Sequence, residues 1–556
     1  MTRKVLLILF ALLTCFATAS ADKKNKLVET YNMMRGIEAL AAEDYETAAE
    51  CFKAEIMNNP NNGYAHCFLG SVYADNNMPG EAIASFEKAI PLFKKDKLMA
   101  ATSYYQLGQC YEALENTEKA IGYYEQAMAL DKKDEDYVFA HINALRACDR
   151  NDEALADVQL LEKKFSDSPT AYVYVGRYYN DTKQYDKAQV AYSNAIQVAG
   201  DVSYSAAYDY RARNYMDLEK WEQAAEDICE AYWIDCSRMA IESMTLMTEK
   251  AYEPMMAALQ RRVDSVADST SEDAKFRRVM TYWCMANTSK EAHKAEEAIQ
   301  YYDKTLAAAD GIEADAILVD AYRNKSLMLG SLERYEEALD CCNQALAVDS
   351  TDVQTFLVRS FTYCGNNRLT DAIADADRII EELPWLALGY STRARYRMYE
   401  GNFVKAIEDL DTASELDGAD AEILLHRGVC YHFIDRQADA ESDFKAVVDL
   451  EGDDDDVLIY KAYAYAYLGQ RAEAFEAFGK TKPNEEEENN AYNLACINTA
   501  LGDKDEAFRQ LDRTAECGYK DYTHIFHDYD LIPLRDDPRF TQFAEKVRAN
   551  AEKAKQ

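Results

Sequence analysis

The stretch GSVYADNNMPGEAIASFEKA, residues 70–89, contains a spacing of small and aromatic residues that recurs along the chain. Gly70 is followed three positions later by Tyr73, and Ala82 is followed four positions later by Phe86. The same frame returns as Gly108, Tyr111, Ala120 and Tyr124, as Gly176, Tyr179, Ala188 and Tyr192, and as Gly428, Tyr431, Ala440 and Phe444. A sequence pattern that recurs at a period of about 34 residues indicates a stack of helical hairpins that bury a continuous core.

The alanine of this frame sets the period. It recurs every 34 residues in each half of the chain, with one four-residue slip after Ala82, at Ala48, Ala82, Ala120, Ala154 and Ala188 and at Ala338, Ala372, Ala406, Ala440 and Ala474. We expect each alanine to lie where the two helices of a hairpin approach closely. The aromatic residue four positions later lies on the same helix stripe and would fill the gap towards the next repeat.

These residues resemble the tetratricopeptide repeat (TPR), in which a small residue and a tyrosine precede an Ala–x3–Phe pair and a closing proline. Pro60 and Pro384 occupy that closing place, and the resemblance covers about residues 29–521. It implies an all-α fold, a right-handed superhelical solenoid of about 14 helical hairpins that ends in a capping helix.

The repeat register predicts the domain boundaries. We expect an N-terminal array of six repeats at 29–238, a degenerate repeat or joint at 239–290, a C-terminal array at 291–521 and a capping segment with its helix at 522–556. We infer the joint from the spacing between Ala224 and Ala298, which is 74 residues, or two 34-residue periods plus six residues. A functional bend and simple decay of one repeat are both compatible with this irregularity.

Residues 1–21 have the order of a secretory signal peptide. Arg3 and Lys4 precede an apolar run, 5–16, and the small residues 17–21 follow it. We therefore expect export, to the periplasm or cell envelope or as a secreted protein, and no transmembrane segment in the mature chain. Lipid attachment at Cys15 is a question that the sequence leaves open.

The chain is strongly acidic, with a formal net charge of -38. This charge argues against nucleic acid as a partner, because phosphate binding needs clustered Lys and Arg. Solvated outer helix faces account for most of the acidity. The sequence does not predict an oligomeric state.

A second pattern pairs an arginine with an aspartate 16 positions later. It occurs four times, as Arg211/Asp227, Arg359/Asp375, Arg393/Asp409 and Arg427/Asp443. Both positions flank the small-residue contact of a hairpin, so we expect charge-assisted pairs with a structural role.

The resemblance implies a concave groove, lined by the first helix of each repeat, that binds peptides or partner helices. In the N-terminal array, Asn143, Arg177 and Arg213 occupy one groove position in successive repeats, where they would hold a carboxylate or an acidic segment. The alternative is that nearby aspartates, Asp181, Asp209 and Asp217, neutralise the arginines. These three residues differ from the two-carboxylate clamp of chaperone-binding TPR proteins, because the Lys and Arg partners that complete that clamp are missing from this sequence.

In the C-terminal array the groove positions are apolar and aromatic. They include Phe361, Tyr399, Leu425, Phe433, Ile459, Tyr463, Tyr467 and Tyr492. Such a groove suits a hydrophobic peptide or an amphipathic helix. The alternative is that several of these rings pack between repeats.

Catalytic and ligand-binding motifs are weak. The segment Gly479–Thr481 lacks the first glycine of a phosphate-binding loop, and no zinc spacing of Cys and His occurs. We expect no cofactor, no metal and no enzymatic activity. The predicted function is an interaction scaffold or adaptor that binds a protein or peptide. The alternatives are a regulatory or substrate-binding component of an envelope transport or secretion system, and a metal-dependent enzyme using His524, His527 and Asp528.

Overall fold

The computed structural model describes residues 30–42, 44–200, 204–235, 238–418, 420–452, 454–481 and 487–554. All regular elements in these ranges are helices, and none of the described helices is long and apolar enough to cross a membrane. The chain divides into two compact units, unit 1 up to Ala258 and unit 2 from Leu259 onwards. The predicted signal peptide, 1–21, lies outside the described residues.

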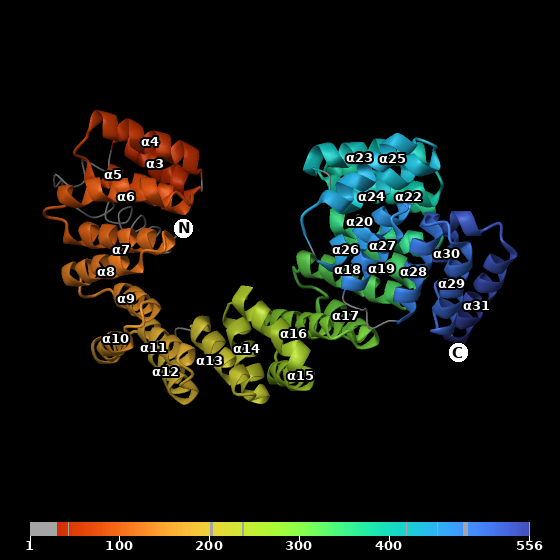
Figure 1. Ribbon diagram of the computed structural model, residues 1–556. Coiled ribbons are helices and arrows are strands. Elements are labelled where there is room, and N and C mark those ends of the chain that lie inside the picture. Colours follow the sequence, from red (N-terminus) through yellow and green to blue (C-terminus); the bar gives the residue numbers. More distant parts are fainter. Residues whose placement is uncertain are drawn as a thin grey trace. The chain divides into compact units, whose positions relative to one another are not determined.

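Unit 1 consists of helical hairpins whose two helices are separated by three residues (Figure 1). Its helices are α3 (Tyr31–Ala41), α4 (Tyr45–Asn58), α5 (Gly63–Asp75), α6 (Pro79–Ala89), η1 (Ile90–Leu92), α7 (Lys97–Ala113), α8 (Thr117–Leu130), α9 (Glu135–Ala147), α10 (Asn151–Lys164), α11 (Pro169–Asp181), α12 (Tyr185–Ala199), α13 (Ser205–Asp217) and α14 (Trp221–Ile234). Ser168 caps α11 by accepting a hydrogen bond from the Ala171 backbone N–H, and Pro169 takes the first helical position.

The repeating alanines are buried, which is compatible with a place where the two helices of a hairpin approach closely. Ala48, Ala82 and Ala120 are fully buried, and Phe86 packs beside Gly70 so closely that an added Cβ at Gly70 would lie 2.7 Å from the Phe86 ring. Only a residue without a side chain permits this approach of ring and backbone.

The helix α15 (Arg238–Ser265) differs from the other helices. It is kinked at Ala251, whose φ of −152° and ψ of 58° are not helical, and Pro254 follows inside the helix. Proline lacks the N–H that would bond one turn back, which explains a break at this place. Ala258 is fully buried, and the boundary between the units follows it.

Unit 2 continues the hairpin pattern with the same three-residue separation. Its helices are α16 (Glu272–Glu291), α17 (Ala295–Ala308), α18 (Asp315–Ser331), α19 (Tyr335–Val348), α20 (Val353–Gly365), α21 (Leu369–Glu382), α22 (Ala387–Tyr399), α23 (Phe403–Asp417), α24 (Ala421–Phe433), α25 (Gln437–Asp449), α26 (Asp455–Tyr467), α27 (Arg471–Lys480), α28 (Glu487–Ala500), α29 (Lys504–Glu516), α30 (His524–His527), η2 (Tyr529–Leu534) and α31 (Pro538–Ala554). The predicted all-α hairpin fold is confirmed.

The four predicted arginine–aspartate pairs are confirmed. In each pair the guanidinium donates two hydrogen bonds to the carboxylate, for example Arg427 Nε and Nη2 to Asp443 at 2.7 and 2.8 Å. Arg427 also donates to Asp411 of the preceding hairpin at 2.9 Å. Arg393 and Arg359 make the same backward bond, to Asp377 and Asn343. In unit 2 these arginines therefore join neighbouring hairpins as well as the two helices of one hairpin.

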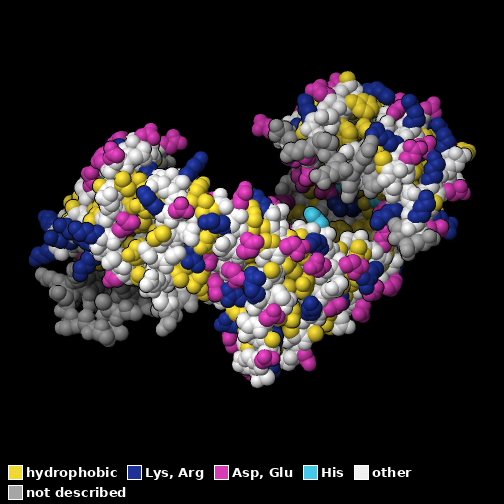
Figure 2. All heavy atoms as spheres, turned by 90° about the horizontal axis from the view of Figure 1, so that it is seen from below, with side chains coloured by type: hydrophobic (Ala, Val, Ile, Leu, Met, Phe, Trp, Pro, Cys, Tyr) yellow, Lys and Arg dark blue, Asp and Glu magenta, His cyan; other side chains and the backbone are white. Residues whose placement is uncertain are grey.

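The last hairpin of unit 2 is covered by the segment that follows it. Leu531, Leu534 and Phe540 are buried in one cluster with side chains of α28 and α29. Acidic and basic side chains are interspersed over the face of the molecule seen in Figure 2, which agrees with acidity carried by solvated surfaces.

Candidate peptide-binding surfaces

In unit 1, Asn143, Arg177 and Arg213 lie at equivalent positions of α9, α11 and α13, and all three are partly exposed. The Arg177 guanidinium lies 4.7 Å from the Phe139 ring centre and 5.3 Å from that of Tyr210. Among the described residues, no carboxylate oxygen lies within 4.0 Å of it. The two rings therefore position the Arg177 guanidinium, which can still form an ion pair with an anion.

The acids that could neutralise these arginines mostly have other partners. Asp181 pairs with Arg146 at 2.8 Å, and Asp217 accepts a hydrogen bond from Asn180 at 3.3 Å. Asp209 is fully buried beside Arg213. Its burial raises the pKa of the Asp209 carboxyl to about 6, against the opposing charge of Arg213.

Arg213 has closer polar partners than Arg177. Its Nε donates to the Ser243 hydroxyl at 3.2 Å, and Nη2 lies 3.9 Å from Glu242. The alternative of internal neutralisation therefore applies to Arg213 and not to Arg177.

Stacked aromatic rings support the Arg177 site, and sequence reasoning missed them. Phe139 stacks on Tyr174 with ring centres 3.9 Å apart, and the Tyr174 hydroxyl donates to Asp136 at 2.6 Å. The sequence does contain an indication of these rings, because Phe139 precedes Asn143 by one helical turn on α9.

In unit 2, residues 524–530, called the segment below, cover the face formed by the first helices of four hairpins, α22, α24, α26 and α28. Tyr467 donates a hydrogen bond to Asp530 at 2.7 Å, and Tyr492 donates one to Asp528 at 2.6 Å. The ring of Tyr529 lies near those of Tyr399 and His426, with ring centres 6.4 and 6.1 Å away.

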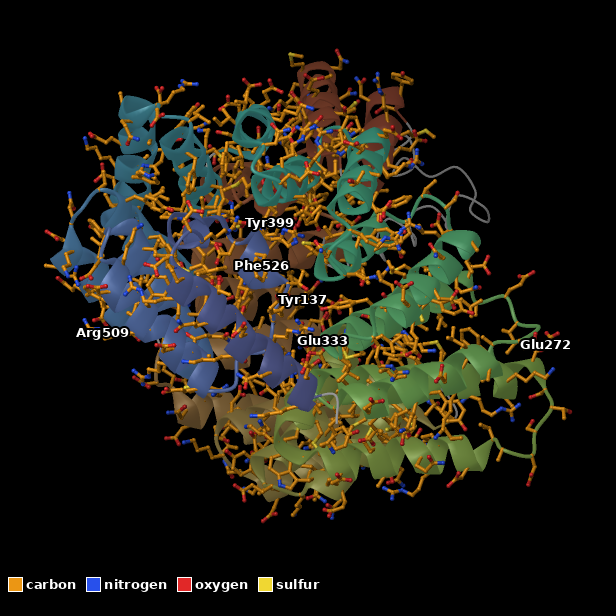
Figure 3. The ribbon with its side chains drawn as sticks, turned by 90° about the vertical axis from the view of Figure 1, so that its right-hand side faces the viewer. Tyr137, Glu272, Glu333, Tyr399, Arg509 and Phe526 are labelled. Carbon is orange, nitrogen blue, oxygen red and sulfur yellow. The ribbon has the colours of Figure 1, made fainter. Side chains whose placement is uncertain are left out.

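The same segment reaches an earlier hairpin. His527 Nε2 lies 2.6 Å from the amide oxygen of Asn367, in the turn after α20. Figure 3 labels Tyr399 at the end of α22 and Phe526 of α30, the short helix that also carries His527.

The predicted aromatic groove is therefore not open along its whole length. Tyr399, Tyr463 and Tyr467 face the segment, and Phe433 stacks on Phe403 with ring centres 4.8 Å apart. Phe361, by contrast, is 42% exposed. A partner-binding role of these five residues stays a prediction, which at the three tyrosines would require the segment to move.

A cavity of about 430 Å³ remains between the segment and the helices. It is lined by Tyr399, Leu425, His426, Val429, Tyr460, Tyr463, Tyr467, Asn489, Tyr492, Asn493, Tyr519, His524, Asp528, Tyr529 and Asp530. Burial lowers the pKa of His426 to about 3, so this imidazole is neutral.

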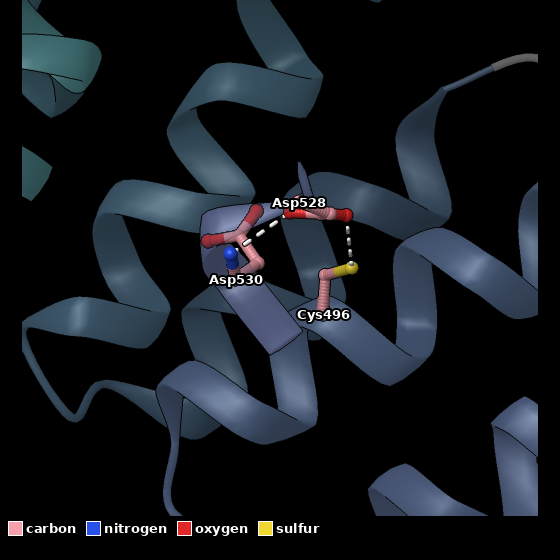
Figure 4. Close-up of side chains that lie close together, drawn as sticks. All are labelled: Cys496, Asp528 and Asp530. Atoms are coloured by element: carbon pink, nitrogen blue, oxygen red, sulfur yellow. Dashed lines mark hydrogen bonds between the residues drawn. The ribbon is translucent and has the colours of Figure 1, made fainter. Parts of the chain in front are cut away.

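The histidines considered for a metal site do not converge with Asp528. His524 Nδ1 lies 3.1 Å from the Tyr519 hydroxyl, and His527 faces Asn367. The described residues instead bring together Cys496, Asp528 and Asp530, whose polar atoms lie within 4.8 Å of one another (Figure 4).

We assign no metal to this second cluster. Asp528 Oδ2 already accepts hydrogen bonds from Tyr492 and from the Cys496 thiol. Burial raises the pKa of Cys496 well above its usual value, so the thiolate that a metal would need is disfavoured.

Three segments match family models described as tetratricopeptide repeat, residues 63–133, 319–352 and 391–455. The chain is 22% identical over 249 residues to the Hsp70-Hsp90 organizing protein of Triticum aestivum, which covers 44% of this chain and 40% of the relative. It is 26% identical over 195 residues to sperm-associated antigen 1 of Mus musculus, which covers 34% of this chain and 19% of the relative. The match thus spans about two fifths or less of these relatives.

Among solved structures, the chain is similar to yeast Tom70, with 14% identity and a TM-score of 0.33 over 82% of this chain and 95% of that chain. It is also similar to YrrB, described as a TPR protein with an unusual peptide-binding site, with 21% identity and a TM-score of 0.25 over 35% and 98%. The family models match segments of both units, and the chain is a tetratricopeptide repeat protein.

Proposed function

We propose that this protein is a non-enzymatic interaction scaffold that binds an acidic peptide segment of a partner protein on the Arg177 face of unit 1. The observation that carries the proposal is the Arg177 guanidinium, which is held between two rings and has no carboxylate partner among the described residues. The relative named for organizing Hsp70 and Hsp90 supports the general role.

The geometry suits a carboxylate. A guanidinium offers two parallel N–H groups to the two oxygens, and its stacking on aromatic rings limits the rotamer freedom lost on binding. Asn143 lies one hairpin before Arg177 and Arg213 one hairpin after it, so an extended segment would pass all three side chains, of which Arg177 is the cation without a carboxylate partner among the described residues. The stacked rings of Phe139 and Tyr174 give such a segment apolar contact.

We expect Arg177→Gln in the full-length protein to weaken the binding of an acidic peptide at least about tenfold, because a charge-assisted pair is lost. The probes are fluorescent eight-residue peptides rich in Glu and Phe, with Gln-for-Glu versions of the same peptides, and the measurement is fluorescence anisotropy at two salt concentrations. The matched control is Arg150→Gln, which removes an arginine engaged with Glu153 outside this face. Equal affinity of Arg177→Gln and wild type, or equal binding of the Gln peptides, would contradict the proposal.

We also propose that the protein is exported, on the support of the basic, apolar and small-residue order of residues 1–21. Mass spectrometry of the protein from its native cells should find a mature N-terminus after Ala19 or Ala21. An intact N-terminal peptide in the bulk of the protein would rule this out.

A further inference from the structure

The cavity in unit 2 has the dimensions of a small-molecule site. Its volume of about 430 Å³ lies within the range of ordinary ligand pockets. Four first helices, α22, α24, α26 and α28, supply one side, and residues 524–530 supply the other. Leu531 and Leu534, which follow these residues, are buried against the last hairpin and anchor this wall of the cavity.

The wall chemistry is aromatic, with polar atoms that have no partner. The hydroxyls of Tyr399, Tyr460 and Tyr529 make no hydrogen bond to any described residue. Tyrosine ring faces carry partial negative charge, and their hydroxyl oxygens can accept hydrogen bonds. Such a lining favours a cation that also donates hydrogen bonds.

The carboxylates give the cavity its charge. Asp530 Oδ1 accepts the Tyr467 hydroxyl, whereas Oδ2 accepts no hydrogen bond from the described residues. The nearest cation on this side is Arg535, which donates to the backbone oxygen of Asp528 at 2.8 Å. Arg395, beneath the cavity, is paired with Glu422. Among the described residues, neither Asp528 nor Asp530 forms an ion pair within 4.0 Å with Arg535 or Arg395.

We propose that this cavity binds a small organic cation with a primary ammonium group, which would donate to Asp530 Oδ2 and lie against the rings of Tyr399 and Tyr529. The site lies in unit 2 and does not depend on the peptide-binding face of unit 1. A primary ammonium has three N–H donors, and the lining offers the carboxylate and several hydroxyl oxygens as acceptors. The strongly acidic chain favours the approach of any cation.

Protonation of Asp530 links this binding to pH. Burial, and then the neighbouring Asp528, raise the pKa of Asp530 to about 8. A cation favours the ionised carboxylate, so below that pKa binding must release a proton, and affinity rises as the pH increases. With that pKa, the ionised fraction of Asp530 rises from about 3% at pH 6.5 to about 76% at pH 8.5, so we expect the affinity to rise about 25-fold.

The other groups around Asp530 do not reverse this sign. Those that face Asp530 or share its cavity are Tyr399 of α22, His426 of α24, Tyr460, Tyr463 and Tyr467 of α26, Tyr492 and Cys496 of α28, Tyr519, and His524, Asp528 and Tyr529 of the segment. Burial raises the pKa of Tyr467 and of Cys496, and His426 is neutral, so these groups keep their charge.

The test is isothermal titration calorimetry on the full-length protein at pH 8.5. The probes are phenethylamine, n-hexylamine and cadaverine, with 2-phenylethanol, n-hexanol and pentane-1,5-diol as their respective neutral isosteres. We expect binding of at least one ammonium, at least tenfold weaker binding of its isostere, and proton uptake by the buffer at pH 7. Asp530→Asn keeps an acceptor for Tyr467 and should weaken ammonium binding at least tenfold with an unchanged melting temperature.

The matched control is Asp536→Asn, which removes an exposed carboxylate just after η2 and should leave binding unchanged. The proposal is overturned if no ammonium binds below about 10 mM, if the alcohols bind as well as the amines, or if Asp530→Asn binds like wild type. Binding of Ca²⁺ or Mn²⁺ in place of every amine would also overturn it.

Discussion

Replacing Arg427 by Met should lower the free energy of unfolding of unit 2 by about 3 kcal/mol. Arg427 is 18% exposed, and Asp443, which receives two of its hydrogen bonds, is 10% exposed. Removal of the guanidinium leaves a buried carboxylate without its partner, and this loss exceeds the worth of an ordinary ion pair. The bond to Asp411 of the preceding hairpin is lost as well. Amide hydrogen exchange of α24 and α25 against urea concentration measures the change.

The matched control lies in the same hairpin. Arg436 pairs with Asp439 at 2.7 Å, but its side chain is 51% exposed and the aspartate 48%. Arg436→Met should therefore change stability by less than about 1 kcal/mol. Similar losses in the two variants would show that burial does not set the strength of these pairs.

Leu531→Ala should destabilise unit 2 by about 3 kcal/mol, through lost apolar burial and the cavity that remains. Leu531 is fully buried in the cluster that joins η2 to α28, α29 and α31. Calorimetric melting of the full-length protein measures the loss, and limited proteolysis should cut between Lys520 and Arg535 earlier than in wild type.

Leu416→Ala is the control for this change, because Leu416 of α23 is 42% exposed. It should shift the melting temperature by a small fraction of the Leu531→Ala shift. Equal shifts would mean that the segment does not stabilise the unit.

Local register explains what the sequence predicts well. An arginine and an aspartate 16 positions apart meet because the turn length and helix period between them are fixed. The same argument reaches Asp411 and Asp377, each 16 positions before its arginine, although only the forward pairs are predicted from the sequence. Contacts that repeat with the 34-residue period can therefore be predicted from a single sequence.

Contacts that occur once are not accessible in this way. The segment around Tyr529 is predicted as a cap on the last hairpin, and Leu531 and Leu534 do cap it. Nothing in a 34-residue period shows that Tyr529 itself turns towards Tyr399 and His426, or that His527 reaches Asn367. The cavity and its carboxylates depend on this single docking event, so residue spacing alone could not predict them.

The contact between His527 and Asn367 also has a consequence for the order of folding. It joins positions 160 residues apart, whereas hairpin contacts join neighbours in the sequence. Closing so long a loop in an unfolded chain costs about 4.5 kcal/mol of chain entropy. When the intervening hairpins have already formed, most of that chain entropy has been lost. Docking of the segment then joins two surfaces that are already folded. The hairpins of unit 2 therefore form first, and the arrival of the segment is the late, slower step that completes the unit.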